Sequence, residues 1–210
     1  METYRELDEI SKDILMEIGN IGAGNAVTSL SQMMDQPIEL EIPALKVLSY
    51  QEVCRVLGQP EELQTGILVE VTGQMKGIFL FMLSETFTNA VIEAILGRRA
   101  QRIMEMDEME TSLVCELGNI MCGSYIRALS QFMNIEMDVS VPELCIDMAG
   151  AILSYPLSHW VIVSDDILLI ENRFQMSGKA YRGHILFLPE QEDLGIMLHR
   201  LRGVAPWIRL

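Results

Sequence analysis

The chain of 210 residues is poor in positive charge and has no long uncharged run. It contains 15 Lys and Arg and 30 Asp and Glu, which gives a formal net charge of −15 at pH 7. Binding to nucleic acid or to an anionic membrane surface needs clustered cations, so this charge argues against both partners. No window of about twenty residues is free of charge, so we expect no membrane span. The acidic N-terminus also lacks the apolar run of a secretory signal, and we expect a cytoplasmic protein.

Also missing are the residue patterns of metal and nucleotide sites. The four cysteines show no CxxC spacing, and the three histidines do not cluster with them in the sequence. We therefore expect no zinc site and interpret the cysteines as reduced, buried small hydrophobic residues. The glycine-rich run from Gly19 to Gly24 lacks both the preceding strand of a dinucleotide-binding turn and the Lys of a phosphate loop. We expect no cofactor for the chain itself.

What the sequence does contain is one motif twice, ninety-nine residues apart. In each copy, a small oxygen-bearing residue is followed four positions later by Glu, three further on by Asn, and after a gap of twenty-two residues by Pro. The two sets are Asp13, Glu17, Asn20 and Pro43, and Ser112, Glu116, Asn119 and Pro142. Between Glu17–Leu45 and Glu116–Leu144, eleven of twenty-nine aligned positions are identical. Such self-similarity indicates an internal duplication.

Both motifs lie on segments with helical periodicity, residues 11–34 and about 107–134. At 100° per residue, each Asp/Ser–Glu–Asn set and the glycine one turn beyond, Gly24 or Gly123, fall within roughly 60° of one another. The opposite faces carry Leu15, Ile18, Gly22, Ala26, Ser29 and Met33 in the first helix and Val114, Leu117, Met121, Tyr125 and Phe132 in the second. We expect these faces to be buried and the motif stripes to be exposed, with the stripe glycines leaving room for a partner.

The rest of the chain predicts a mixed fold. Strands are expected at 38–48, 66–72, 77–83, 160–170 and 179–188, and helices at 50–57, 84–97 and 193–201, with residues 145–157 partly helical until Pro156. Pro43 should confine its strand to an edge, an end or a bulge. The fold class is α/β mixed (α+β): long motif-bearing helices packed on a largely antiparallel sheet, with pseudo-two-fold symmetry between the halves. We expect a single domain, residues 1–210, made of two repeats at about 9–97 and 108–203.

The repeated Glu and Asn favour a chemistry of positioning. They point the same way on a helix, include no nucleophile–base pair and are too few for a metal site. Glu can accept a cation of a partner, and the Asn amide can hold a water in line with an electrophile. Phosphoryl transfer from a metal-bound acyl phosphate needs only such positioning. The ordinary alternative is a solvated helix face, but Asn is unfavourable in a helix centre and its recurrence after Gly favours a function.

The pattern [Asp/Ser]-x3-Glu-x2-Asn-x22-Pro resembles the signature of the CheC/CheX/FliY family of chemotaxis phosphatases. Both copies match at every fixed position, and the resemblance covers nearly the whole chain. Two intact copies in 210 residues are similar to the CheC-type members of the family. The resemblance implies a protein phosphatase (EC 3.1.3.-) of chemotaxis signal transduction, which hydrolyses the aspartyl phosphate of the response regulator CheY.

The resemblance also implies roles for the motif residues. Asn20 and Asn119 would orient the attacking water, and Glu17 and Glu116 would pair with the phosphate-contacting lysine of the regulator. The positions that would support the motif are Asp13, Ser112, Pro43 and Pro142. The Mg²⁺ would belong to the regulator. CheC proteins also bind CheD, a receptor deamidase, and we place that surface loosely around residues 145–153, apart from the motif helices.

An alternative from another class is a non-catalytic adaptor, whose faces would bind CheY or CheD without accelerating hydrolysis. Turnover with the regulator in excess separates the two hypotheses. Because both copies keep the Glu and the Asn, we expect both faces to work.

Overall fold

The computed structural model describes residues 7–57, 62–100, 102–159 and 166–204. The first half of the chain forms α1 (Glu9–Met33), β1 (Ile38–Ser49), α2 (Tyr50–Val56), β2 (Leu63–Gly73), β3 (Gly77–Ser84) and α3 (Glu85–Leu96). After a 3₁₀ turn at Ile103–Glu105, the second half forms α4 (Glu108–Met133), β4 (Met137–Val139), β5 (Glu143–Met148), α5 (Ala149–His159), β6 (Asp166–Met176), β7 (Lys179–Pro189) and α6 (Gln191–Val204).

The two long helices begin and end in the same way. Each begins after an aspartate, Asp8 or Asp107, whose side chain accepts a backbone N–H of the first turn. Each is followed by a residue with left-handed backbone, Asp35 at φ 47° and Asn134 at φ 51°, a conformation that Asp and Asn tolerate better than most residues. These equivalent signals, again ninety-nine residues apart, confirm the duplication in the local structure.

All strands pair antiparallel in one seven-stranded sheet, with the order β1-β6-β7-β3-β2-β4 and with β5 also on β2. The first strand of each half pairs with the hairpin of the other half: β1 with β6, and β4 and β5 with β2. The hairpins meet at the centre, where β3 pairs with β7. Exchanging the halves leaves this order unchanged, so the predicted antiparallel sheet and pseudo-two-fold symmetry are confirmed.

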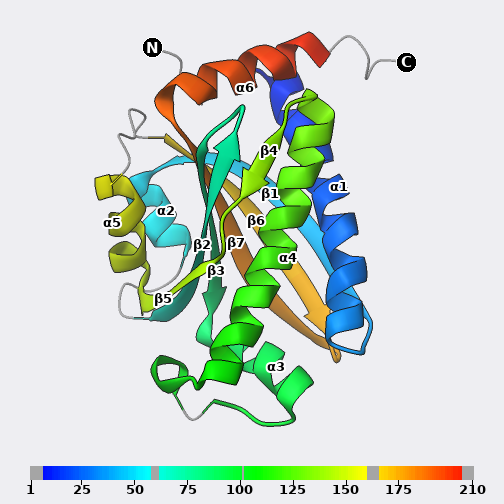
Figure 1. The fold of residues 1–210 in the computed structure, drawn as a ribbon, viewed down its shortest axis with the longest axis vertical. Helices are drawn as coiled ribbons and strands as arrows, with labels where there is room; N and C mark the ends of the chain where they lie inside the picture. The colour runs from blue at the N-terminus through cyan, green and yellow to red at the C-terminus, as the bar shows by residue number, and fades with distance from the viewer. Residues whose placement is uncertain (1–6, 58–61, 101, 160–165, 205–210) are drawn as a thin grey trace.

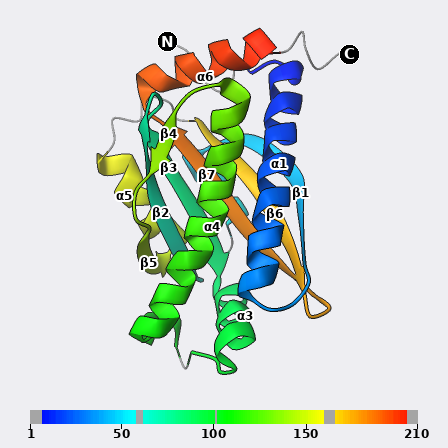
Figure 2. The same cartoon turned by 45° about the vertical axis from the view of Figure 1, so that its right-hand side comes forward.

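Helices cover both faces of the sheet. Figure 1 shows α1 and α4 side by side and antiparallel on one face, and Figure 2 shows the same pair after a turn of 45°. The short helices α2 and α5 lie behind the sheet, and α3 and α6 lie at opposite ends of the molecule (Figures 1 and 2). The larger hydrophobic core fills the space between the long helices and the sheet, and a smaller one lies under α2 and α5. This layering positions the outer sides of α1 and α4 at the surface.

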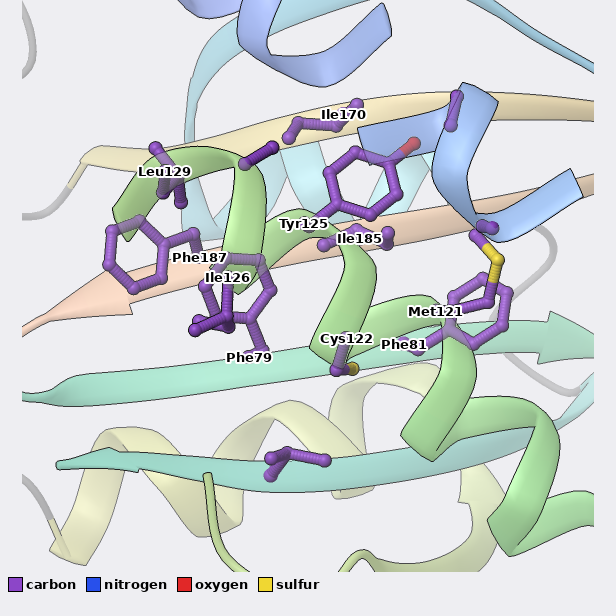
Figure 3. Packing of buried hydrophobic residues seen from close by; sticks show 14 of the residues in the cluster. Phe79, Phe81, Met121, Cys122, Tyr125, Ile126, Leu129, Ile170, Ile185 and Phe187 are labelled. Atoms are coloured by element: carbon purple, nitrogen blue, oxygen red, sulfur yellow. The ribbon is translucent and has the colours of Figure 1, made fainter. Parts of the chain in front are cut away.

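The two long helices meet through residues of unequal size. A Cβ added at Gly22 of α1 would lie 3.1 Å from the Cα of Tyr125 of α4, so the helix backbones approach closely at this point. Figure 3 shows Tyr125 and Met121 of α4 in this core, together with Phe79 and Phe187 of the sheet. Tyr125 is fully buried, and its hydroxyl donates to Asn172 Oδ1 of β6 at 2.5 Å. The small face of the first helix therefore accommodates the bulky face of the second.

The motif prolines lie on the two edges of the sheet. β1 is one edge strand, and its register shifts between Glu41 and Ala44, which confirms that Pro43 is at an edge and a bulge. Pro142 lies in the gap between β4 and β5, which form one interrupted edge along β2. Because proline cannot donate a hydrogen bond to a neighbouring strand, both positions limit further pairing at an exposed edge.

Some predicted boundaries were wrong. β6 continues to Met176, beyond the predicted end at Ile170, while residues 160–165 lie outside the described ranges. Along this extension every second residue is buried, namely Asn172, Phe174 and Met176, and the residues between them are more exposed. A search for a continuous apolar run misses this period of two. The stretch 145–157 is partly helical as predicted, but it begins within the strand β5, and α5 passes Pro156 and ends at His159.

The predicted burial also needs corrections. Ser29 is exposed, and Met33 and Phe132 are only half-buried, whereas Leu30, Met34 and Met133 at the ends of the same helices are buried. Among the cysteines only Cys122 is buried, whereas Cys145 is exposed and Cys54 and Cys115 are half-buried. All four thiols are free.

Candidate active site

The motif side chains of both helices face outwards. On α1, Asp13, Glu17 and Asn20 are exposed, while Ile14 and Ile18 between them are buried. On α4, Ser112, Glu116 and Asn119 are likewise exposed, and the intervening Val114 and Leu117 are buried. Each set therefore forms one stripe, called here the first and the second motif face, on the side of its helix away from the sheet.

A glycine before each asparagine brings the helix down onto the sheet. A Cβ added at Gly19 would lie 2.9 Å from Ile42 Cδ1 of β1, and one at Gly118 would lie 2.3 Å from Ile67 Cγ2 of β2. Both distances are shorter than real Cβ contacts. At Gly118 the branched side chain of Ile67 blocks a larger residue, and at Gly19 the terminal methyl group of Ile42 would have to move. Sequence reasoning missed this role, although the recurrence of Gly before Asn was its signal. The contact fixes the depth and rotation of the turn that carries the asparagine.

The second glycine of each face leaves space beside the asparagine. A Cβ at Gly24 or Gly123 would meet nothing within 4 Å. Alanine in place of glycine at an open helix position stabilises a helix by about 1 kcal/mol, so the helices do not need these glycines for their own stability. The geometry agrees with the expectation that a partner approaches here.

The key polar side chains are free to meet a partner. In the ranges that the structure describes, Glu17, Asn20, Glu116 and Asn119 make no side-chain hydrogen bond or ion pair with the rest of the chain. They also do not line either of two surface hollows. One of these, of about 450 Å³, lies between the end of α1, α3 and the β6–β7 turn, and the other, of about 280 Å³, lies on the opposite sheet face near Arg182 and His184. The motif residues are thus exposed outside these two hollows, which suits a macromolecular partner rather than a small enclosed ligand.

The start of α4 is fixed by the segment between the repeats. Arg98 forms ion pairs with Asp107, at 2.5 Å, and with the buried carboxylate of Glu110. Hydrogen bonds from the backbone at Glu110 and from Arg98 lower the pKa of Asp107, and Asp107 caps the helix. The arrangement holds the turn that leads into Ser112.

Cys115 lies beside Glu116 but faces the protein more than the solvent. It is half-buried, and burial raises its pKa, so the neutral thiol is favoured. A nucleophilic cysteine needs the thiolate, so the structural interpretation holds.

Two further features concern ligands and membranes. Within the four described ranges, no three side chains of His, Cys, Asp or Glu gather closely enough to ligate a metal ion. The helices in the same ranges include none that combines the length and the apolar character of a bilayer span.

Comparison with known proteins identifies the repeated segment. The model of the CheC-like family matches residues 10–47 and 109–146, which are the motif helix and the following edge strand of each half. The chain thus carries one segment similar to this family in each repeat. It is 29% identical over 197 residues to the CheY-P phosphatase CheC of Bacillus subtilis, covering 92% of this chain and 94% of that protein. It is 24% identical over 140 residues to the flagellar motor switch phosphatase FliY of the same organism, covering 66% of this chain and 36% of that protein.

Solved structures of other proteins show the same fold. The FliY structure from Thermotoga maritima superposes with a TM-score of 0.73 at 22% identity and covers 94% of this chain and 98% of that one. The FliM middle domain from H. pylori gives 0.66 at 12% identity, covering 92% and 99%. CheX from Desulfovibrio desulfuricans gives 0.52 at 17% identity, covering 83% and 99%.

Proposed function

We propose that this CheC-like protein is a phosphatase that hydrolyses the aspartyl phosphate of the response regulator CheY. The observation that carries the proposal is the pair of exposed Glu-x2-Asn faces, each with an open glycine beside the asparagine. The likeness to the CheY-P phosphatase CheC of B. subtilis along most of both chains supplies the identity of the substrate.

In this mechanism the chain contributes position and the regulator contributes the reactive group. Glu17 or Glu116 pairs with the lysine that contacts the phosphate on the regulator. Asn20 or Asn119 enters the regulator's site and holds a water in line with the phosphorus, so that water and aspartyl phosphate give aspartate and inorganic phosphate. The glycine that faces the sheet fixes the asparagine's turn, which limits the entropy lost on docking. Mg²⁺ is expected on the regulator, and the reaction is expected in the cytoplasm.

A non-catalytic adaptor would use the same faces only for binding. The unpaired, exposed faces suit both hypotheses. Asparagine favours catalysis, because a face that only binds has no need of an amide at the same position in both repeats.

We further propose that CheD binds behind the sheet, where residues 145–153 form the end of β5 and the start of α5. The large apolar side chains of Met148, Tyr155 and Tyr50 are 44%, 50% and 37% exposed. They belong to β5, α5 and α2, away from the motif faces, and exposed apolar groups of this kind are typical of interaction surfaces. Met148→Asp should weaken CheD binding in a pull-down and leave hydrolysis of CheY-P unchanged.

The assigned roles predict separable kinetic effects. Glu17→Ala/Glu116→Ala should mainly raise KM for phosphorylated CheY, while Asn20→Ala/Asn119→Ala should mainly lower kcat. Asn25→Ala is a matched control, because Asn25 is exposed on α1 but lies about 140° around the helix from Asn20. Phosphate release measured over a range of CheY-P concentrations separates the effects. Tight binding with no acceleration by the parent protein would establish the adaptor instead.

A further inference from the structure

The two motif faces differ in charge at equivalent positions. The first carries Asp13 and Glu17, and the second carries Ser112 and Glu116. Further along the helices, Thr28 of α1 corresponds to Arg127 of α4. Across these positions the first face has two negative charges, while the second has one negative and one positive charge. The duplicated faces therefore differ by two unit charges.

Arg127 lies on the same stripe as the motif. It is exposed, and Ile126, Ala128 and Leu129 around it are buried, so its side chain projects away from the core. Eleven residues separate it from Glu116, which places the two within about 20° around the helix. Along the axis it is about 12 Å beyond Asn119. One globular partner docked over Asn119 can reach both positions.

The guanidinium of Arg127 is also unpaired. In the described part of the chain, Arg98, Arg99, Arg102 and Arg173 all form ion pairs, whereas Arg127 forms none. Arg55, Arg182 and Arg200 also form no ion pair in the described residues, but they lie on α2, β7 and α6, whereas Arg127 lies on a motif face. It is available to a carboxylate of a partner, which it can bind through two parallel hydrogen bonds.

We propose that Arg127 is a docking residue that makes the second motif face the tighter site for phosphorylated CheY, by pairing with an acidic side chain about 12 Å from the phosphoryl group. This inference rests on the proposed phosphatase function. A regulator that holds Mg²⁺ through carboxylates has an acidic surface around its phosphorylation site. The Glu of each face pairs with the regulator's lysine, so the faces differ in the other two positions. Asp13 on the first face repels the acidic surface, whereas the second face has Ser112 in its place and adds the cation of Arg127. The difference acts on encounter and affinity rather than on the hydrolytic step.

The test isolates each face by removing the other asparagine. Asn20→Ala leaves the second face active, and Asn119→Ala leaves the first. At low salt the KM for phosphorylated CheY should be roughly two- to fivefold lower for the second face, with equal kcat. Arg127→Thr in the Asn20→Ala protein should remove this advantage, and Arg127→Lys should retain part of it. Thr28→Arg in the Asn119→Ala protein should lower its KM.

Ionic strength supplies a second readout. The KM ratio of the two faces should approach one as NaCl rises to about 0.5 M, because surface charges are then screened within a few ångströms. If Asn119→Ala removes the activity of the second face, that face is catalytic. The inference is then wrong if Arg127→Thr leaves both the KM of that face and its salt dependence unchanged. If neither asparagine affects hydrolysis, the proposed function fails. In that case the role of Arg127 is tested by measuring the binding of CheY that carries beryllofluoride. The inference predicts that Arg127→Thr weakens the tighter of the two binding sites. Unchanged binding overturns the inference.

Discussion

Each motif asparagine follows a glycine that faces the sheet and precedes, four residues later, a glycine that faces open space. Helical periodicity places Gly24 and Gly123 on the exposed stripe, but it does not show that Gly19 and Gly118 approach Ile42 and Ile67 of the sheet. The distances from an added Cβ distinguish the two kinds of glycine: at Gly118 the Cβ would clash with Ile67, and at Gly123 it would meet nothing within 4 Å.

Gly118→Ala and Gly123→Ala should therefore have opposite effects on stability. The new methyl group at 118 clashes with Ile67, and such overpacking costs about 1–3 kcal/mol. The methyl group at 123 meets nothing, so the variant should gain up to about 1 kcal/mol from helix propensity. Urea unfolding midpoints measure both. In the Asn20→Ala background, Gly123→Ala should also slow phosphate release, because the methyl group narrows the space beside Asn119. Equal stabilities of the two variants would contradict the packing described.

Tyr125 connects α4 to the sheet through one buried hydrogen bond. Tyr125→Phe leaves Asn172 Oδ1 without this donor in a site where Asn172 is 1% exposed. An unpaired buried acceptor costs about 1–3 kcal/mol, which urea unfolding should detect. Tyr50→Phe is the control: its hydroxyl donates to Gly150 O at 3.3 Å on the surface, and its loss should stay within about 0.5 kcal/mol. Equal effects of the two variants would show that the Tyr125 hydroxyl has no special role.

The beginning of α4 depends on an arginine that comes from outside the helix. Arg98 pairs with the capping carboxylate of Asp107 and with the buried carboxylate of Glu110. The sequence alone indicates that the basic run at 98–102 is a linker. The ion pairs of Arg98 form only because α3 ends beside the start of α4. Part of this linker therefore supports the second motif face.

Arg98→Ala should destabilise the protein in a pH-dependent way. The folded pKa of Asp107 is lowered, by backbone hydrogen bonding at Glu110 and then by Arg98, so its ionised form stabilises the fold. This contribution is present above the unfolded pKa of an aspartate, near pH 4, and disappears as pH falls through the lower folded pKa. The stability difference between parent and variant should thus be largest near neutral pH and shrink in acid. Arg99→Ala, which removes only the exposed pair with Glu93, should show little difference at any pH.

Local patterns predicted the elements well wherever one face of an element is buried. The motif helices, the strands at 66–72 and 77–83 and the helix at 84–97 follow from periodicity, and all are observed. Ser84 and Gly97 cap the last of these helices. The end of β6 and the residues of β5 were missed, because their pairing with β1 and β2 from the other half stabilises them. Such long-range pairing leaves little trace in a single segment.

The whole sheet is shared between the two repeats. The second half supplies β6 as the partner of β1. It also supplies β4 and β5 as the outer partners of β2. Neither half can therefore complete its own sheet, which supports our proposal that residues 1–210 form a single domain.

A chain divided after Ala100 tests this proposal. Residues 1–100 alone should lack a cooperative unfolding transition by circular dichroism, because β1 has lost β6 and the buried side of α1 has lost α4. Mixing with residues 101–210 should restore folding. A stable, cooperatively folded first half would show instead that the repeats are separate domains.

The candidate site could be predicted from the sequence because its residues lie on the exposed, duplicated faces of two helices. Motif spacing and helical geometry place Glu17, Asn20, Glu116 and Asn119 at the surface, and the structure shows them there. Their chemical roles stay predictions, since they depend on a regulator that supplies the phosphoryl group and the metal.

The most direct measurement is the initial rate of phosphate release from an excess of phosphorylated CheY, with and without a small amount of this protein. The parent should release many phosphates per molecule. The Asn20→Ala/Asn119→Ala protein, with an unchanged unfolding midpoint and unchanged binding of CheY, should release them no faster than CheY alone. Release by the double variant at the parent's rate, or no acceleration by the parent, would contradict the proposed catalysis by the two asparagines.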